Sequence, residues 1–499
     1  MLRKIRILLA TVIFTLVTLL FLGTGWAFVR YIAWTAKIQF LPALLALNYA
    51  VLAVLVTVTL VFGRIYCSIV CPLGIMQDVF AWLGRQKRLK PLGKPNRYGH
   101  SPEKRLLRYT VLCVFVVCLL AGFAPLTTLL APYSAYGRIV SNLLRPLTDL
   151  LLNGAASIES HYDSYVFQTA DVWMRSVTTF VIALLTFVGI GLLAWRNGRT
   201  WCNTVCPVGT LLSFFSRFSL LKIQFDKDKC KNCSRCEKNC KTAAIDFKAG
   251  TVDYSRCVVC GDCIEECKFG ALSYKASWKS SKTGEPAGSS AEPSRRAFLT
   301  GSALAVGSIA MAQTKMKVDG GLAVLEEKKV PHRETPLTPP GSVSGKNMQR
   351  HCTACQLCVS VCPNNVLRPS TDPLHLMQPV MSFERGWCRP ECTRCSEVCP
   401  TSAIRPVTRE EKTAIHAGHA VWIQQNCIPV TNGDECGNCA RHCPAWAIHM
   451  VETNINGKTV RVPSIDPERC IGCGSCEYIC PARPFSAIYV EGNKMHRID

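Results

Sequence analysis

Four long apolar runs and six cysteine-rich motifs predict the fold class of this chain. The prediction is a membrane α-helical domain, a four-helix bundle from two repeated hairpins, joined to α+β modules of the ferredoxin-like fold. Of the 499 residues, 49% are hydrophobic, which excludes a disordered protein. The 30 cysteines exceed what packing needs, yet the chain is too long for a small disulfide scaffold. The spacing of the cysteines therefore has to decide whether they form disulfides or metal sites.

The apolar runs cover residues 8–29, 41–62, 109–131 and 178–195, and none has an ionisable residue near its middle. Each approaches the roughly 20 residues that a helix needs to cross a bilayer. Buried core helices of a soluble protein are seldom this long and apolar. We therefore expect residues 1–222 to form a four-helix transmembrane domain.

Basic residues in the flanks set the orientation of these helices. Segment 64–108 carries 10 basic and 2 acidic residues, whereas segments 30–40 and 132–177 together carry 5 basic and 4 acidic. The N-terminus and segment 64–108 are expected in the cytoplasm of a bacterial inner membrane. The formal net charge of +23 then marks a cytoplasmic membrane face and does not indicate nucleic-acid binding.

A repeat links the two halves of this domain. Residues 63–74 and 198–209 both read G-R-x-aromatic-C-x3-C-P-x-G, each at the end of a hairpin. Two hairpins related by an axis along the membrane normal would bring the two loops together. Four converging thiolates suit an iron–sulfur cluster, copper(I) or zinc, and a redox-active dithiol is the alternative. The four cysteines are Cys67, Cys71, Cys202 and Cys206.

Residues 223–275 carry the spacing C-x2-C-x2-C-x3-C twice, which is typical of two-cluster bacterial ferredoxins. In this pattern the fourth cysteine of each run binds the cluster of the other run. One [4Fe–4S] cluster is assigned to Cys230, Cys233, Cys236 and Cys267, and the other to Cys257, Cys260, Cys263 and Cys240. Lys241 and Lys268 stand where a proline usually follows the fourth cysteine.

Residues 276–312 are expected to form a linker and an internal export signal. The segment begins rich in Ser, Lys, Gly and Pro, and then reads Ser294-Arg295-Arg296-Ala297-Phe298-Leu299, which has the form of a twin-arginine signal. A small apolar stretch follows to Ala312. We expect everything after it to be periplasmic, with the segment acting as a fifth membrane anchor or a cleaved signal. A helix packed on the neighbouring domain is the alternative reading.

Residues 313–499 contain four more cysteine quartets, enough for four further [4Fe–4S] clusters and six in total. The long interval between the first two cysteines of the third quartet predicts an inserted hairpin turning at Asn432-Gly433. Consecutive and nested pairing of the four runs fit the spacing equally well. The quartets are Cys352, Cys355, Cys358 and Cys362; Cys388, Cys392, Cys395 and Cys399; Cys427, Cys436, Cys439 and Cys443; and Cys470, Cys473, Cys476 and Cys480.

Several other redox and nucleotide-binding classes are excluded. No histidine lies in the apolar runs and no C-x-x-C-H occurs, so neither a membrane bis-His haem nor a c-type haem is expected. Rossmann and P-loop fingerprints are absent from the sequence. His416 and His419 could form a ligand pair, but such spacing more often marks an ordinary structural feature.

These motifs resemble a known family. Residues 1 to about 275 resemble NapH-type membrane quinol dehydrogenase components, which include MauN and, more distantly, NosR. Residues from about 294 onward resemble the twin-arginine-exported polyferredoxins NapG and MauM, so the chain looks like a natural fusion of the two. The resemblance implies quinol oxidation and electron transfer to a periplasmic reductase or cytochrome in anaerobic respiration. A quinone head group is expected beside Arg64, Tyr66, Arg199 and Trp201, with interfacial anchoring as their alternative role.

One difficulty and one rival reading stay open. The first two clusters are expected on the inner face and the last four on the outer face, with no haem between them. The C-x3-C-P site is expected at the inner face and so does not close this gap. The rival is a maturation factor that delivers electrons or copper to a periplasmic metalloenzyme.

Overall fold

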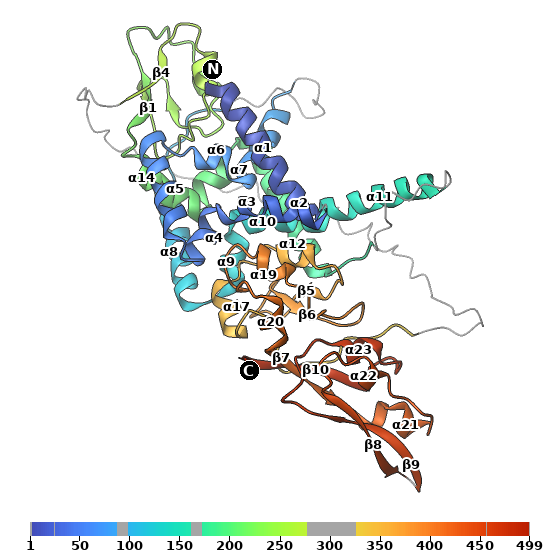
Figure 1. The fold of residues 1–499 in the computed structure, drawn as a ribbon. Helices are drawn as coiled ribbons and strands as arrows, with labels where there is room; N and C mark the ends of the chain where they lie inside the picture. Colours follow the sequence, from blue (N-terminus) through green and yellow to red (C-terminus); the bar gives the residue numbers. More distant parts are fainter. Residues whose placement is uncertain are drawn as a thin grey trace, which may run out of the picture.

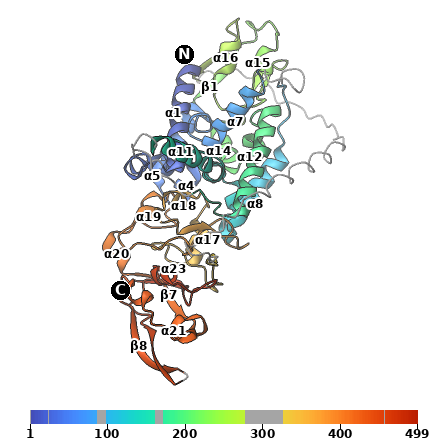
Figure 2. The same ribbon diagram turned by 90° about the vertical axis from the view of Figure 1, so that its right-hand side faces the viewer.

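The computed structural model describes residues 2–23, 25–86, 98–160, 172–276, 326–455 and 457–498. Figure 1 shows a small module near the N-terminus, a helical part below it, and a C-terminal part at the opposite end. The same order along the molecule holds in the view turned by 90° (Figure 2). Nearly all of the expected linker and the whole twin-arginine segment lie outside the described residues.

The helical part consists of short helices packed around two long ones. α1 and α12 are long and apolar enough to cross a membrane, and no other helix of the described residues reaches that length and composition. The helices, in chain order, are α1 (Leu2–Leu22), α2 (Trp26–Ile32), α3 (Trp34–Lys37), α4 (Phe40–Leu45), α5 (Tyr49–Phe62), α6 (Tyr66–Ile69), α7 (Pro72–Leu83), α8 (Arg105–Ala121), α9 (Ala124–Leu130), α10 (Pro132–Ile139), the π-helix η1 (Val140–Leu144), α11 (Arg145–Ser160), α12 (Val177–Asn197), α13 (Thr200–Thr204) and α14 (Pro207–Ser216).

The second and third apolar runs differ from the expectation of unbroken spans. The second is split into α4 and α5, because Leu47 has a φ of 52° and the Asn48 side chain caps α5 through the Val51 amide at 3.2 Å. Within the third run, helix α8 ends at Gly122, whose φ of 74° is the left-handed conformation that stops a helix. We expect four spanning helices from the sequence, but among the described residues two, α1 and α12, are long and apolar enough to cross a membrane.

The module nearest the N-terminus is formed by residues 221–276. β1 (Leu221–Phe225) pairs antiparallel with β4 (Leu272–Ala276), and β2 (Ile245–Asp246) pairs antiparallel with β3 (Thr251–Val252). Each half has one short helix between its two strands: α15 (Arg235–Lys238) between β1 and β2, and α16 (Asp262–Glu266) between β3 and β4. Both halves close over one small core, so the module is two copies of one βαβ-like unit.

The C-terminal part has one short and two long strand pairs, and the two long pairs repeat the plan of the N-terminal module. β5 (Leu367–Pro369) pairs with β6 (Pro379–Met381), β7 (Ile415–Trp422) with β10 (Ile488–Ile498), and β8 (Ile448–Ile455) with β9 (Lys458–Ile465), all antiparallel. Its helices are α17 (Gly345–His351), α18 (Leu357–Val361), α19 (Arg394–Val398), α20 (Arg409–Thr413), the 3₁₀ turn η2 (Gln424–Asn426), α21 (Ile428–Thr431), α22 (Asn438–Arg441) and α23 (Ser475–Ile479).

The predicted hairpin between Cys427 and Cys436 is wrong. The interval forms helix α21, which begins directly after Cys427 with Pro429 in its first turn. Proline fits the first turn of a helix and cannot donate to a strand ladder. Asn432 ends the helix, and Gly433 follows with a φ of 77°.

Candidate functional site: a chain of cysteine quartets

The two halves of the C-x3-C-P repeat hold each other through their arginines. Arg64 of the first half donates to the carbonyl oxygen of Cys202 at 3.5 Å, and Arg199 of the second half donates to that of Cys67 at 2.7 Å. Both guanidinium groups are fully buried. The contacts are reciprocal, as expected for motifs related by a pseudo-twofold axis.

The closing glycines of the motifs permit this close packing. An ideal Cβ on Gly74 would lie 2.5 Å from the Cys67 carbonyl oxygen, and one on Gly209 would lie 2.4 Å from the Cys202 carbonyl oxygen. Real Cβ atoms do not come so near to backbone oxygen, so the last position of the motif needs glycine.

All four thiols of the repeat are buried, and every pair lies within electrostatic range. Cys71 and Cys206 stand at the N-terminal ends of α7 and α14, where the helix dipole favours negative charge. Gln77 donates to the Cys202 sulfur at 3.2 Å, and Gly209 donates its amide to the Cys206 sulfur at 3.4 Å. The setting suits thiolates that share a metal centre.

In the N-terminal module each motif contributes three cysteines to one group and one to the other. The first group lines a single cavity, and the second is joined by mutual electrostatic contacts. This is the grouping assigned from the spacing. The groups are Cys230, Cys233, Cys236 and Cys267, and Cys240, Cys257, Cys260 and Cys263.

The backbone of the cysteine runs has one repeated geometry. Four of the six runs contain two left-handed residues, one before the second and one after the second cysteine; Asn232 and Ser234 are the first such pair. Five runs have another left-handed residue three positions after the fourth cysteine. Side chains other than glycine rarely adopt this conformation unless their surroundings impose it. The runs are therefore shaped to wrap around a bulky group.

Backbone amides point at the sulfurs of these runs. Ala244 donates to Cys240 at 3.4 Å, Ala271 to Cys267 at 3.3 Å, and an equivalent bond joins Ala447 to Cys443 at 3.3 Å. Hydrogen bonds to cluster sulfurs are among the factors that set the reduction potential of a cluster. The residues present thus fit [4Fe–4S] clusters.

The four runs of the C-terminal part pair consecutively, which settles the choice left open by the spacing. The first and second runs each give their fourth cysteine to the other run's group. The third and fourth runs do the same with each other. The four groups, ordered away from the helical part, are Cys352, Cys355, Cys358 and Cys399; Cys362, Cys388, Cys392 and Cys395; Cys443, Cys470, Cys473 and Cys476; and Cys427, Cys436, Cys439 and Cys480.

The groups are linked to one another and to the helical part. The Cys388 amide donates to the Cys473 carbonyl at 2.9 Å, which joins the second group to the third. At the other end, Arg138 of α10 faces Cys355, and Asn142 donates to Gln356 at 2.8 Å. The first group of the C-terminal part therefore rests directly on the helical part.

One continuous apolar core connects the two cysteine-rich parts through the repeat. It includes Cys260 of the N-terminal module, three cysteines of the repeat, and Cys355 of the C-terminal part. Tyr66 lies within electrostatic range of the repeat thiols, and Tyr133 within range of both Tyr66 and Cys355. The C-x3-C-P site therefore lies between the cysteine groups of the N-terminal module and those of the C-terminal part, which corrects the expectation that it leaves the two parts unconnected.

The four residues expected beside a quinone head group have other positions. Arg64, Tyr66 and Arg199 are at most 3% exposed. Tyr66 donates to Gln39 at 3.0 Å, and Trp201 is half-buried against the same core. The two arginines hold the halves of the repeat together, and none of the four side chains lines the cavity described next.

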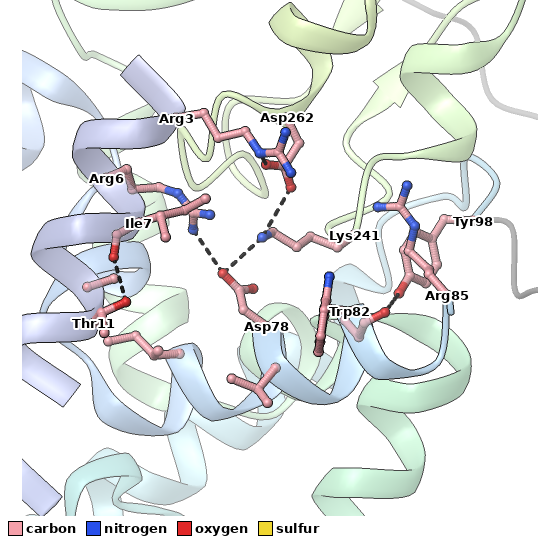
Figure 3. A pocket seen from close by; sticks show the side chains of 14 residues that line it. Arg3, Arg6, Ile7, Thr11, Asp78, Trp82, Arg85, Tyr98, Lys241 and Asp262 are labelled. Atoms are coloured by element: carbon pink, nitrogen blue, oxygen red, sulfur yellow. Dashed lines mark hydrogen bonds and ion pairs between the residues drawn. The ribbon is translucent and has the colours of Figure 1, made fainter. Parts of the chain in front are cut away.

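A cavity of about 310 Å³ lies between α1, α7 and the N-terminal module (Figure 3). Asp78 of α7 is at its centre, bonded to Arg6 at 2.9 Å, to Lys241 at 2.9 Å and to Arg199 at 2.5 Å. Lys241 also bonds Asp262 at 3.2 Å. Burial by itself raises the pKa of Asp78, but the three cations hold it well below its usual range.

Sequence reasoning missed Asp78 and gave Lys241 no structural role. Two signals were available: one of only two acids in the strongly basic segment 64–108, and a lysine where proline usually follows the fourth cysteine. The lysine ties the N-terminal module to α7, which a proline could not do. Because the helical motif and the module are far apart in sequence, neither signal alone indicates the ion pair.

The two histidines considered as a ligand pair are bonded elsewhere. His416 Nδ1 lies 2.9 Å from the Cys470 carbonyl oxygen, and His419 Nδ1 lies 3.0 Å from Asn493. Among the described residues, no three His, Cys, Asp or Glu side chains come close enough together to hold a single metal ion. Thiolates that bind a cluster surround a larger object and need not meet that condition.

Comparison with known families places iron–sulfur domains along the chain. A family described as "4Fe-4S binding domain" matches residues 44–91 and 179–226, the two segments that hold the C-x3-C-P repeat. Other families with this description match residues 222–245, 251–273 and 349–368. A "4Fe-4S dicluster domain" family matches residues 433–483.

Curated relatives are ferredoxin-type proteins. The methylamine utilization ferredoxin-type protein MauM of Methylobacillus flagellatus is 31% identical over 168 residues, which are 32% of this chain and 70% of MauM. MauN of Paracoccus denitrificans is 30% identical over 182 residues, 36% of this chain and 49% of MauN. NapG of Escherichia coli is 29% identical over 179 residues, 33% of this chain and 77% of NapG. The chain thus spans about half the length of MauN, and no solved structure matches it.

Proposed function

This chain belongs to the family of the ferredoxin-type protein MauM, and we propose that it oxidises a membrane quinol and passes the electrons to a periplasmic acceptor. It is an iron–sulfur electron-transfer protein with several [4Fe–4S] clusters, related to MauM, MauN and NapG. The acceptor in this proposal is a periplasmic reductase or cytochrome. No step requires a nucleotide or a nucleic acid.

The observation that carries the proposal is an unbroken series of seven cysteine quartets along the molecule. Two lie in the N-terminal module, one is the C-x3-C-P repeat, and four lie in the C-terminal part. Clusters of this kind transfer one electron at a time, and the protein tunes each through hydrogen bonds and burial. A series of seven has a donor end and an acceptor end at opposite ends of the molecule.

The quartet of the C-x3-C-P repeat is the step that joins the two sides. The family matching both halves of the repeat is described as binding [4Fe–4S], which favours a seventh cluster over a dithiol at this position. The residues that would hold it are Cys67, Cys71, Cys202 and Cys206. Bound there, a cluster would accept and donate single electrons in a site from which water is excluded by burial.

The surface of the helical part supports membrane anchoring. α1 and α12 expose apolar side chains such as Leu8 and Leu185, at 65% and 67%. Figure 1 shows α11 extending sideways from the helical part. The exposed residues of α11 include Leu147, Leu151 and Ile158, as in a helix lying in a membrane interface.

Both ends of α1 support opposite placement of the two iron–sulfur parts. Near its start, Arg3 bonds Asp262 of the N-terminal module at 3.1 Å. Near its end, Phe21 stacks on Tyr133, which faces Cys355 of the C-terminal part. With the N-terminus cytoplasmic, the C-terminal part is periplasmic, as a NapH-like unit fused to a NapG-like unit requires. The domain limits in this proposal are 1–222, 223–275, 276–312 and 313–499.

An anaerobic assay with purified protein tests the proposal. We expect a menaquinol or ubiquinol analogue to reduce the clusters, seen as bleaching of the iron–sulfur absorption. The iron content should be about 24 per chain for six clusters and about 28 with the seventh. A chain that dithionite reduces but no quinol reduces would reject quinol oxidation.

The rival reading, a copper-handling maturation factor, makes a different prediction for the same preparation. It expects bound copper that is lost on replacing Cys67 and Cys71, and electron delivery without turnover. Loss of about four iron in that variant would support the seventh cluster instead.

A further inference from the structure

We propose that the cavity between α1, α7 and Lys241 is the site at which the quinol head group binds. The inference rests on the proposed quinol oxidation and names its site. The cavity volume, about 310 Å³, falls in the range of small-molecule sites, which begins at roughly 300 Å³.

The entrance of the cavity is apolar and open to the outside of the helical part. Ile7 of α1 and Val79 and Trp82 of α7 line it and are 43%, 44% and 59% exposed. Of the two helices, α1 is one of those long and apolar enough to cross a membrane, and α7 lies beside its N-terminal end. A quinol whose isoprenoid tail stays in the membrane could thus enter with its head group first.

The inner wall of the cavity is polar and suited to a hydroquinone. Asp78 Oδ2 receives bonds from Arg6 and Lys241, whereas among the described residues its Oδ1 is bonded by Arg199 alone. A carboxylate oxygen has two lone pairs, so Oδ1 can accept a hydroxyl hydrogen from the head group. Arg6 Nε is buried and has no hydrogen-bond acceptor among the described residues, so it is a donor free for the second oxygen.

An electron acceptor lies directly behind this wall. Lys241 follows Cys240 in the chain and is within electrostatic range of Cys260, and Asp262 precedes Cys263. All three cysteines belong to the second group of the N-terminal module. The cavity is therefore next to the cluster that these residues fit, at the start of the series.

The reaction balances with the centres already described. Oxidation of the quinol breaks two O–H bonds and yields a quinone, two electrons and two protons. The two electrons reduce two [4Fe–4S] clusters of the N-terminal module by one electron each. A second cavity, of about 330 Å³, shares Tyr98 and Lys241 with the first and is lined by polar residues such as Glu103 and Asn203, so the protons can leave through it.

Photolabelling of the purified, cluster-loaded full chain with an azidoquinone tests this site. We expect the label on peptides of α1 and α7. Val79→Trp fills the entrance and should lower labelling and raise the quinol KM at least tenfold, with iron content and dithionite reduction unchanged. Val12→Trp, on the exposed face of α1 away from the cavity, is the matched control and should behave as wild type.

The outcomes separate the site from the function. If quinol reduces the wild type and Val79→Trp equally well, or if the label lies elsewhere, this site is wrong while quinol oxidation stands. If Val79→Trp loses only bound phospholipid and keeps its quinone labelling, the cavity is a lipid site and the inference is overturned. If no quinol reduces the wild type, the proposed function itself fails.

Discussion

Two arginines and two glycines hold the halves of the C-x3-C-P repeat against each other. Arg64 and Arg199 each reach a carbonyl of the opposite motif, and Gly74 and Gly209 leave the space in which those carbonyls lie. The pattern was visible in the sequence, because the two motifs match position by position. The contacts between the two motifs were not visible in the sequence, because the residues that make them are more than 130 positions apart in the chain.

Replacing Gly74 by alanine should destabilise the repeat. The new Cβ would meet the Cys67 carbonyl, and such overpacking costs about 1–3 kcal/mol. Gly189→Ala in α12 is the control: its Cβ would meet nothing within 4 Å, and glycine to alanine in a helix stabilises by up to about 1 kcal/mol. Thermal unfolding in detergent measures both, and equal midpoints for the two variants would refute this role of Gly74.

Lys241→Met should loosen the N-terminal module from α7. The substitution removes two buried ion pairs and leaves Asp262 with Arg3 alone among the described residues. Losing one partner of a buried pair costs about 3–5 kcal/mol. Lys268→Met, at the equivalent but exposed position, should change little. Hydrogen exchange of residues 236–267 checks this, and identical exchange in both variants would contradict it.

His496 should make the stability of the C-terminal part depend on pH. Burial lowers the pKa of this imidazole from 6.5 to about 4, and it bonds Thr338 at 3.0 Å. The unfolded chain binds the proton below pH 6.5 and the folded one only below about 4. Stability is therefore full above pH 6.5 and falls by about 1.4 kcal/mol per pH unit down to about 4.

Unfolding curves at pH 7.0 and 5.0 measure this, with His496→Gln as the reference. The wild type should lose more stability than the variant between the two values. An equal loss in both proteins would show that other groups cause the acid sensitivity.

Among the elements, the cysteine runs could be predicted well and the apolar helices only in part. Ligand spacing is local, so the runs around Cys230 and Cys257 indicate their fold directly. Whether an apolar run is one helix depends on single residues, and Leu47 and Gly122 break two of them. The hairpin predicted at Asn432-Gly433 is wrong for a similar reason, because these two residues end a helix instead of turning a hairpin.

Consecutive pairing of the outer runs predicts which clusters a single substitution removes. Cys399→Ala should eliminate the cluster of Cys352, because Cys399 belongs to that group. This cluster is nearest the helical part, so electrons should no longer reach the other three. Cys480→Ala should remove only the terminal cluster. Electron paramagnetic resonance after quinol reduction distinguishes the variants, and reduced outer clusters in Cys399→Ala would refute the order.

For the whole molecule, the decisive feature is that the repeat lies between the two iron–sulfur parts. The sequence indicated each part separately, but it left a gap between inner and outer clusters. The two parts are connected by packing between distant segments: Tyr133 lies within electrostatic range of Cys355, and Asn142 donates a hydrogen bond to Gln356. Contacts of this kind leave no pattern in the local sequence, whereas the cysteine ligands that they connect can be recognised from their spacing.

The most direct test of the account is to break the series at the repeat and see where electrons stop. Cys67→Ser with Cys202→Ser should leave the other six clusters loaded. With a menaquinol analogue under anaerobic conditions, the two clusters of the N-terminal module should be reduced and the four outer clusters should stay oxidised. Outer clusters reduced as fast in this variant as in the wild type would contradict electron transfer through the repeat.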